Sequence, residues 1–318
     1  VVWVQAVQVS ERRMPASTNV PVSARSALAW VMVGTFAGEC LRRLAASEPI
    51  ARLLSRLRSK PLFTLWYFRG PPRALGLVMV AEFSGLPWAG PGDTPIGWAT
   101  PEMVQRVKTL KKKSPFGQFP IIVTKDGQTI GQTAACANYI GKLAGPWYEG
   151  VGDEYSTSQM LLSQFEDMYL LLKKYSNTSF VKVGDNQPDE GAIIEDGSTK
   201  STAGFDHFWS VTAPHHLGCL ERMTRPGVEN AIHAFTDSVR PGELMIWSMI
   251  HQYKMASATC LDPFPRLAAW YAAFLADPRT QKVLRQKTAY GCMSYIYFLP
   301  PAGLPIPTLD VGLPPIGI

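Results

Sequence analysis

The stretch from Lys111 to Lys142, KKKSPFGQFPIIVTKDGQTIGQTAACANYIGK, constrains the fold of this chain more than any other. Pro120 stands directly before the β-branched residues 121–123, and a proline is tolerated at the first residue of a strand because its missing N–H is not needed there. Asp126-Gly127 then separates this strand from residues 129–130. A tight Asp-Gly turn between two apolar runs predicts a β-hairpin.

A helix follows the hairpin. Gln132-Thr133 opens a run of good helix formers from Ala134 to Leu143, and we expect Thr133 at the cap, where a hydroxyl satisfies free backbone N–H groups. Such a helix start attracts carboxylates through its exposed N–H groups and its dipole. At the entrance of the first strand, the Phe119-Pro120 bond is compatible with the cis form. The segment therefore predicts a strand, a hairpin and a helix whose start forms a small anion site.

This order of elements resembles the C-terminal half of the thioredoxin-like, glutathione-binding domain of the cytosolic glutathione transferase family. The resemblance predicts an earlier strand and helix, and the chain supplies both. Residues 63–68 form a β-rich run, Gly70-Pro71-Pro72 forms a turn, and an apolar helix begins at Arg73. Gly85 is expected to stop this helix.

The end of that first strand carries the candidate catalytic residue. In the tyrosine-type classes of the family (alpha, mu, pi and sigma) the strand ends Tyr-Phe, and the tyrosine hydroxyl donates a hydrogen bond to the glutathione sulfur. The matching residue is Tyr67. A donor of this kind favours the thiolate, which lowers the thiol pKa and supplies a nucleophile near neutral pH. Arg73 stands where these classes keep an arginine at the helix start.

The resemblance also assigns glutathione contacts in the opening segment. Phe119, with Gln118 and Pro120 beside it, would offer its backbone N–H and C=O to the cysteinyl part of glutathione. Gln132 would face the γ-glutamyl group, and Thr133 would contact glutathione from the helix start. Glutathione is thus expected as a substrate, with no metal.

Two further contacts rest on spacing alone. Lys111 lies seven residues before Gln118, where sigma and pi members carry the basic residue that meets the glycyl carboxylate. The alternative for Lys111 is a solvated charge in a Lys-Lys-Lys run. Asp167 matches an acid that reaches the glutathione of the partner subunit, so the resemblance implies a homodimer; the alternative for Asp167 is an ordinary surface acid.

Downstream motifs extend the resemblance to roughly residues 62–284. The span Tyr155–Lys174 predicts an amphipathic helix, with apolar residues at helical spacing: Met160, Leu161, Phe165, Met168 and Leu172. Before a later core helix, the family has a Ser or Thr and an Asp as a capping box, whereas this chain has Arg240 and Glu243. Losing a hydroxyl cap costs about 1 kcal/mol, so we expect either drift or a compensating contact.

The expected fold is an α/β thioredoxin-like N-terminal domain at residues 61–146, followed by an all-α glutathione transferase C-terminal domain at residues 150–288. The acidic, Gly-rich stretch 183–205 reads as an insertion. Residues 1–60 form a basic extension, and residues 289–318 form an apolar tail that is rich in proline. A tail of this composition favours extended docking against a surface.

Charge and cysteine content exclude some classes of function. The net charge of +6 arises in residues 1–60, which hold nine Lys or Arg against three Glu, whereas residues 61–318 hold twenty-two of each sign. Nucleic-acid binding needs a basic face on the folded body, so it is not expected. The five cysteines show no Cys-x-x-Cys pattern and are odd in number, which argues against a disulfide framework and a metal site. Cys136 is expected in the core.

The N-terminal extension leaves two interpretations open. Residues 49–60 predict a basic amphipathic helix, of the kind that lies on a membrane surface or a partner. The apolar run 27–38 is shorter than the roughly twenty residues that cross a bilayer. Arg- and Ser-rich composition is also typical of organelle targeting, which indicates a plastid or mitochondrion rather than the cytoplasm. We favour an extension that is retained.

Two function classes follow. In the first, Tyr67 activates glutathione for conjugation or peroxide reduction. In the second, the chain is a non-catalytic, transferase-like accessory subunit of an organellar membrane complex, held by residues 1–60 and 289–318. The prolines at Gly70-Pro71-Pro72 depart from the family pattern in the loop that shapes the electrophile side of the cleft. This departure argues against efficient catalysis more than against glutathione binding.

Overall fold

The computed structural model describes residues 60–68, 71–92, 96, 100–175, 177–178, 202–227, 231–291 and 298–299. All of them belong to one of the compact units into which the chain divides, Ala46–Ile318. The predictions for the extension at 1–59, for the insertion up to residue 201 and for most of the tail lie outside the described residues. Within the described residues, no helix is long and apolar enough to cross a membrane.

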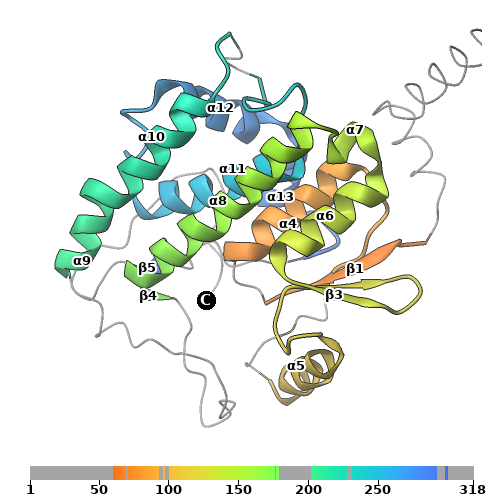
Figure 1. The fold of residues 1–318 in the computed structure, drawn as a ribbon. Helices are drawn as coiled ribbons and strands as arrows, with labels where there is room; N and C mark the ends of the chain where they lie inside the picture. Colours follow the sequence, from red (N-terminus) through yellow and green to blue (C-terminus); the bar gives the residue numbers. More distant parts are fainter. Residues whose placement is uncertain are drawn as a thin grey trace, which may run out of the picture. The chain divides into compact units, whose positions relative to one another are not determined.

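The first half is built on a small sheet (Figure 1). Strands β1 (Phe63–Trp66), β2 (Ile121–Thr124) and β3 (Thr129–Gly131) pair antiparallel in the order β1-β2-β3. On the other side of β1, Ala89 forms a parallel bridge with Thr64. The Leu65 N–H donates to the Ala89 carbonyl at 2.9 Å, and the Ala89 N–H donates to the Phe63 carbonyl at 2.9 Å. β1 is therefore held on both edges.

The hairpin and its entrance confirm the sequence prediction. Gly127 adopts φ +85° in the turn between β2 and β3, a conformation that glycine takes at no steric cost. The Thr124 N–H donates to the Gln128 carbonyl at 2.9 Å and closes the turn. The Phe119-Pro120 peptide bond is cis, as its position before the strand allowed.

Helices cover both faces of the sheet. α4 (Pro71–Ser84) and α6 (Thr133–Ala144) lie over one face, and α5 (Pro101–Lys113) lies over the other (Figure 1). Side chains alternate along a strand, so Leu65 and Ile122 join the core beneath α4, whereas Ile121 packs with Val107 and Leu110 of α5. Gly85 ends α4 with φ +68°, as predicted.

Two predicted helix starts are wrong by one or two residues. α4 begins at Pro71 and not at Arg73, because proline fits the first helical turn, where its missing N–H has no intrahelical partner anyway. α6 has Gln132 at its N-cap, and Thr133 is the first helical residue. The expected capping by the Thr133 hydroxyl is therefore wrong, and no side chain caps this helix.

The second half is helical. Its elements are α7 (Pro146–Glu149), α8 (Asp153–Tyr175), α9 (Thr202–His207), the π-helix η2 (Phe208–Thr212), α10 (Ala213–Met223), α11 (Pro241–Ala256), α12 (Pro265–Ala276) and α13 (Pro278–Leu284). The short strands β4 (Asn177–Thr178) and β5 (Phe298–Leu299) pair antiparallel, so this part of the predicted tail pairs with its own chain.

α11 is the central element of the core. Every residue from Pro241 to Tyr253 is buried, and the helix packs against α8 on one side and α4 on the other. α4 is in turn buried from Ala74 to Ala81. Both halves of the chain therefore share one hydrophobic core.

α8 extends slightly beyond its predicted span, and one predicted core residue does not lie in the core. Leu161, Phe165, Met168 and Leu172 are buried, but Met160 is 55% exposed. Met160 lies one position before the buried stripe, which places it on the outer side of the helix. A methionine in an amphipathic helix is thus no proof of burial.

A compensating contact replaces the missing capping hydroxyl before α11. The Glu243 carboxylate is fully buried and accepts hydrogen bonds from the N–H groups of Ala234 at 2.9 Å, Phe235 at 2.8 Å and Arg240 at 3.4 Å. Arginine has no acceptor atom, so only this half of a capping box is formed. Burial raises the pKa of Glu243 to about 7, although the backbone donors lower it.

Candidate functional site

Tyr67 lies immediately after β1 and is only 8% exposed. Arg73 from the first turns of α4 lies next to it, and Glu166 and Tyr169 approach from α8. Arg73 donates to both carboxylate oxygens of Glu166, with Nη2–Oε2 at 2.6 Å and Nε–Oε1 at 3.3 Å. Its guanidinium also lies 4.2 Å from the centre of the Tyr169 ring. The neighbouring elements β1 and α4 thus meet the distant helix α8 at one phenol.

The environment keeps this phenol protonated. Burial raises the pKa of Tyr67 well above its usual value, the neighbouring Tyr169 and Glu166 raise it further, and Arg73 opposes the shift by its charge and a hydrogen bond. Burial lowers the pKa of Arg73, but the hydrogen bond to Glu166 and nearby charges raise it by more. At neutral pH the cluster therefore contains a neutral phenol, a guanidinium cation and a carboxylate partner.

The neighbouring Arg73 decides which part of the phenol is left for a ligand. Arginine only donates, so Arg73 can act on Tyr67 only through the phenol oxygen. The phenol proton is then the part of the group that can be donated to a third atom. A donated proton stabilises an anionic acceptor such as a thiolate and lowers the pKa of the corresponding thiol.

The loop before β2 brings the Gln-Phe-Pro turn against the end of β1. The Ser114 hydroxyl donates to the Gln118 carbonyl at 2.7 Å and accepts from the Gln118 N–H at 3.1 Å. The Phe119 ring meets the Phe68 ring edge to face, with centroids 5.2 Å apart. Pro120 is buried, and the Gln118 side chain is exposed. Ser114 was missed by sequence reasoning, although a serine directly before a proline is typical of a loop.

Gln132 stands at the start of α6 in an uncommon conformation. Its φ is +73°, whereas non-glycine residues rarely have positive φ. Its side chain is exposed, and the adjacent Thr133 is 4% exposed. Strain of this kind persists where the surroundings impose it and is frequent at ligand sites. The exposed Gln132 and the start of α6 form the second element of the candidate site.

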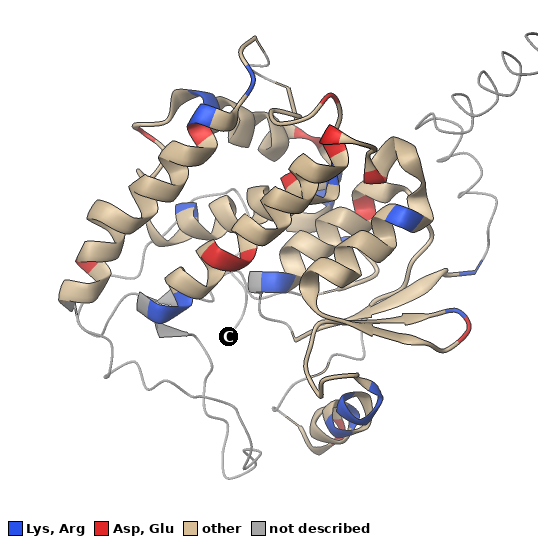
Figure 2. Cartoon of the chain, in the orientation of Figure 1, with Lys and Arg blue, Asp and Glu red and all other residues tan. Residues whose placement is uncertain are grey.

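Lys111 lies in the last turn of α5, a helix on which Figure 2 shows several Lys and Arg positions in blue. Its side chain is half-buried, while Lys112 and Lys113 are exposed. The helix thus carries its basic charges close to the loop that leads to Gln118.

Asp167 does not join the cluster around Tyr67. Its side chain is exposed and borders a shallow pocket on the outer side of α8, together with Met160, Ser163 and Gln164. The neighbouring Glu166 instead faces Arg73. The contact of Asp167 with the glutathione of a partner subunit stays a prediction. Sequence reasoning missed Glu166 and Tyr169, although the spacing of three residues places those two on one face of the helix.

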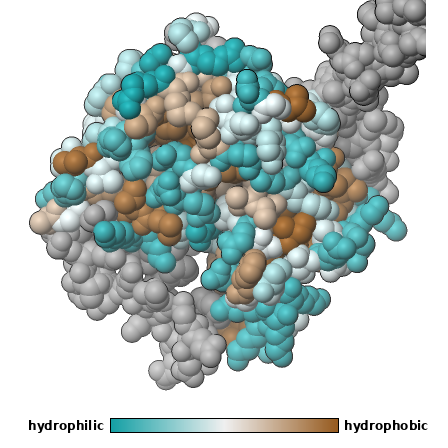
Figure 3. Space-filling model, viewed as in Figure 1, coloured by the Kyte–Doolittle hydropathy of each residue, from teal (hydrophilic) through white to brown (hydrophobic). Residues whose placement is uncertain are grey.

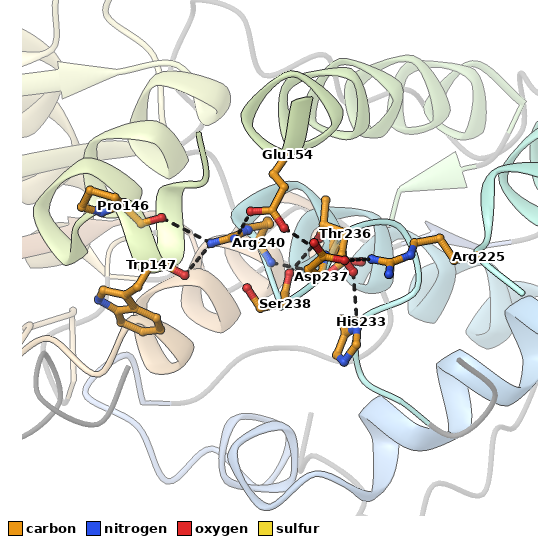
Figure 4. A network of polar contacts seen from close by, with 10 residues as sticks. Pro146, Trp147, Glu154, Arg225, His233, Thr236, Asp237, Ser238 and Arg240 are labelled. Atoms are coloured by element: carbon orange, nitrogen blue, oxygen red, sulfur yellow. Dashed lines mark hydrogen bonds and ion pairs between the residues drawn. The ribbon is translucent and has the colours of Figure 1, made fainter. Parts of the chain in front are cut away.

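A second polar network lies at the start of α11 (Figure 4). Arg240 donates to the carbonyls of Pro146 and Trp147 and pairs with Glu154 of α8. A cavity of about 530 Å³ beside it is bordered by Phe83, Trp147, His233, Asp237 and Arg279, among others. Because Arg240 and Arg279 are each paired with a carboxylate, this network serves mainly to join α7, α8 and α11.

Cys136 is fully buried, and burial raises the pKa of its thiol to about 12. Among the described residues, no three His, Cys, Asp or Glu side chains are grouped so as to hold a metal ion.

Comparison with solved structures identifies the fold. The chain resembles the structure of prostaglandin synthase D of Nilaparvata lugens, with a TM-score of 0.51 and 16% identity over 72% of this chain and 99% of that one. It resembles the pi-class glutathione S-transferase of Onchocerca volvulus, with a TM-score of 0.53 and 14% identity over 70% of this chain and 91% of the other.

The protein NaGST-2 gives a similar result, with a TM-score of 0.53 and 18% identity over 71% of this chain and 97% of that one. No model of a protein family matches the sequence, and no curated protein matches it either. The small sheet and the helical half thus form a glutathione transferase fold, and at these identities the likeness is one of fold.

Proposed function

We propose that this chain binds glutathione and activates its thiol for conjugation to an electrophile or for reduction of a peroxide. The observation that carries the proposal is the position of Tyr67 at the end of β1, beside an Arg73 that Glu166 holds with hydrogen bonds of 2.6 and 3.3 Å. Because arginine has donors only, the Tyr67 proton is left for the glutathione sulfur. The thiolate is then stabilised by one hydrogen bond and by the nearby positive charge of Arg73.

The rest of the site would hold the tripeptide. Gln132 and Thr133, at the start of α6, take the γ-glutamyl end, where the backbone N–H groups of a helix start favour a carboxylate. The backbone of Phe119, which the cis bond to Pro120 and the Ser114–Gln118 hydrogen bonds fix in place, takes the cysteinyl part. Lys111 on α5 takes the glycyl carboxylate.

The test compares wild type with Tyr67→Phe, which removes only the hydroxyl. Retention on glutathione resin and a thiol-conjugation assay are measured for both proteins. We expect both to bind the resin and the variant to lose conjugation by about 10- to 100-fold, the effect of one hydrogen bond to a charged group. Tyr139→Phe, a half-buried tyrosine on α6, is the control. Equal conjugation by wild type and Tyr67→Phe would remove Tyr67 from the mechanism.

We also propose a homodimer through the outer side of α8. Met160 and Leu170 are each 55% exposed on this helix, with Asp167 between them. On the face drawn in Figure 3, apolar residues lie in several separate patches among polar ones. In sedimentation equilibrium, wild type should be a dimer and Met160→Glu should be a monomer. The control variant Leu143→Glu, which alters an exposed leucine of α6, should remain a dimer. A monomeric wild type would contradict this arrangement.

A second candidate function is that of an accessory subunit of an organellar membrane complex, without catalysis. The observation that favours it is the burial of Tyr67, since a phenol that is 8% exposed meets a ligand only after its neighbours move. In this case residues 1–60 and 289–318 hold the protein in the complex, in a plastid or mitochondrion. Cell fractionation and native-gel migration distinguish the accessory subunit from the enzyme. A small dimer in the soluble cytoplasmic fraction argues against a subunit of a membrane complex.

A further inference from the structure

The chain returns to the end of β1 after α13. Residues Thr288–Gly291 form a compact turn, in which the Gly291 N–H donates to the Thr288 carbonyl at 3.1 Å. The Tyr290 N–H donates to the Thr288 hydroxyl at 3.3 Å. Tyr290 is 2% exposed and belongs to the same hydrophobic core as Tyr67. This turn is therefore packed into the protein although it lies beyond the last helix.

Two glycines allow the turn to approach the segment that follows α4. A Cβ atom on Gly90 would lie 2.7 Å from the Ala289 carbonyl oxygen and from the Cα of Tyr290. A Cβ atom on Gly291, which has φ +78°, would lie 2.8 Å from the carbonyl oxygen of Gly92. Both distances are shorter than contacts between a side chain and a backbone, so only glycine fits. Residues 89–92 themselves pair with β1 through Ala89.

The Tyr290 hydroxyl makes the direct connection. It donates to the carbonyl of Phe68 at 2.6 Å, across 222 positions of sequence. Phe68 directly follows Tyr67, and the two rings meet with centroids 5.7 Å apart. The Phe68 ring in turn meets Phe119. Phe68, whose carbonyl Tyr290 holds, thus contacts both Tyr67 and the loop proposed to bind the cysteinyl part of glutathione.

We infer that Tyr290 is a positioning residue for Tyr67, through which the C-terminal segment fixes the thiol-activating group; this inference rests on the proposed function. Holding the Phe68 carbonyl fixes the backbone at the end of β1. The orientation of the Tyr67 side chain relative to Arg73 depends on that backbone. A displacement of about 1 Å of a catalytic group can reduce the rate by about 100-fold, so a hydroxyl that prevents smaller displacements has a measurable effect.

The variant Tyr290→Phe removes only the hydroxyl and keeps the buried ring. We expect kcat to fall about 10-fold while the KM for glutathione changes less than about 2-fold, because an interaction felt in the transition state is lost and ground-state binding is kept. The acid limb of the pH–rate profile should move to higher pH, since a misplaced donor stabilises the thiolate less.

The chain offers a matched control. Tyr148 is 1% exposed, and its hydroxyl donates to the Val80 carbonyl at 2.8 Å, near the other end of α4. Tyr148→Phe therefore removes a buried bond of the same kind at a place remote from Tyr67. Both variants should lose a similar amount of stability, but only Tyr290→Phe should alter kcat and the pH profile. If the two variants have the same kinetics, the inference is overturned.

Hydrogen exchange gives a readout that does not depend on activity. Amides of residues 65–68 and Ala89 should exchange faster in Tyr290→Phe than in wild type, and they should be unchanged in Tyr148→Phe. If wild type neither binds glutathione nor conjugates it, the proposed function fails, and exchange alone decides whether Tyr290 holds the end of β1. Unchanged exchange in Tyr290→Phe overturns the inference in either case.

Discussion

Gly242, the second residue of α11, marks the closest approach between the helix and α8, and enlarging it tests the packing of the whole core. A Cβ atom placed on Gly242 would lie 2.9 Å from the Leu161 Cβ and from the carbonyl carbon of Ser158, and closer still to the Ser158 oxygen. Carbon atoms prefer separations of about 3.5–4.0 Å. The obstacle is backbone that cannot rotate away, so Gly242→Ala must push α11 from α8 by about 1 Å.

The cost can be worked from three contributions. Overpacking of a core by one methyl group costs about 1–3 kcal/mol, and the upper end applies because backbone is involved. The same shift weakens the hydrogen bond from the Gly242 N–H to the Ser158 hydroxyl, which is 3.0 Å long and worth about 1 kcal/mol. Alanine returns about 1 kcal/mol through its better helix propensity. Gly242→Ala should therefore destabilise the protein by about 3 kcal/mol.

Gly218 on α10 is the matched control. A Cβ atom there would meet only the Phe264 ring at 3.6 Å and the Arg222 side chain at 3.7 Å, which are ordinary contacts. Gly218→Ala should stabilise the protein by up to about 1 kcal/mol through helix propensity alone.

Thermal and urea unfolding of the two variants measure the difference. At about 2–4 °C per kcal/mol for a chain of this size, the Tm should fall by about 6–12 °C in Gly242→Ala and rise slightly in Gly218→Ala. A Gly242→Ala protein at least as stable as wild type would refute the close packing of α11 on α8.

Three further predictions concern charge, strain and pH. Glu166→Gln should move the acid limb of the pH–rate profile down by up to about one pH unit, because a negative charge near the thiolate is lost. The free energy of unfolding should change by less than about 1 kcal/mol, since the side chains of Arg73 and Glu166 are each about a quarter exposed. An unchanged pH–rate profile would contradict the proposed role of the residues around Tyr67. Gln132→Gly should stabilise the fold by about 1 kcal/mol, because it relieves backbone strain at φ +73°. Calorimetry should show about 10-fold weaker binding of glutathione to this variant. An unchanged affinity would mean that the strained residue does not belong to the glutathione site. Burial lowers the pKa of His251 to about 4, so the unfolded state binds a proton more readily and the contribution of His251 to stability should fall from about pH 6.5 down to pH 4, by up to about 3 kcal/mol. Glu243, whose pKa is raised to about 7, acts in the opposite direction over this range, so the measurement is the difference in stability between His251→Phe and wild type in pH-dependent urea unfolding. The variant should gain stability relative to wild type as the pH falls, and a difference that does not change with pH would contradict the prediction.

The fold was predictable where local signals and burial agree. The hairpin at Asp126-Gly127 and the end of α4 at Gly85 depend on backbone conformations that glycine adopts at no steric cost, so short stretches of sequence predict their positions. The helix starts were less predictable, because Pro71 fits a first turn as well as a loop. Met160 was misplaced since one residue of rotation separates the core face of α8 from its outer side.

The candidate site was predictable only in part, because its members meet through tertiary contacts. Tyr67 and Arg73 could be named from their positions in a familiar order of elements. Glu166 and Tyr290 could not, since nothing local indicates that an acid on α8 reaches Arg73 or that a tyrosine beyond α13 reaches Phe68. The replacement of a hydroxyl cap by Arg240 was visible in the sequence, but Ala234 and Phe235, the partners of Glu243, lie in a loop with no recognisable pattern.

The position of α4 has a consequence for biosynthesis. This helix is buried on the side of the sheet and on the side of α11, yet Ser84 leaves the ribosome long before Pro241. At about 5–20 residues per second, the covering helix is completed roughly 10–30 s after α4. During that interval the nascent chain carries an apolar helix with one uncovered side, so we expect its yield in cells to depend on chaperones that bind the growing polypeptide.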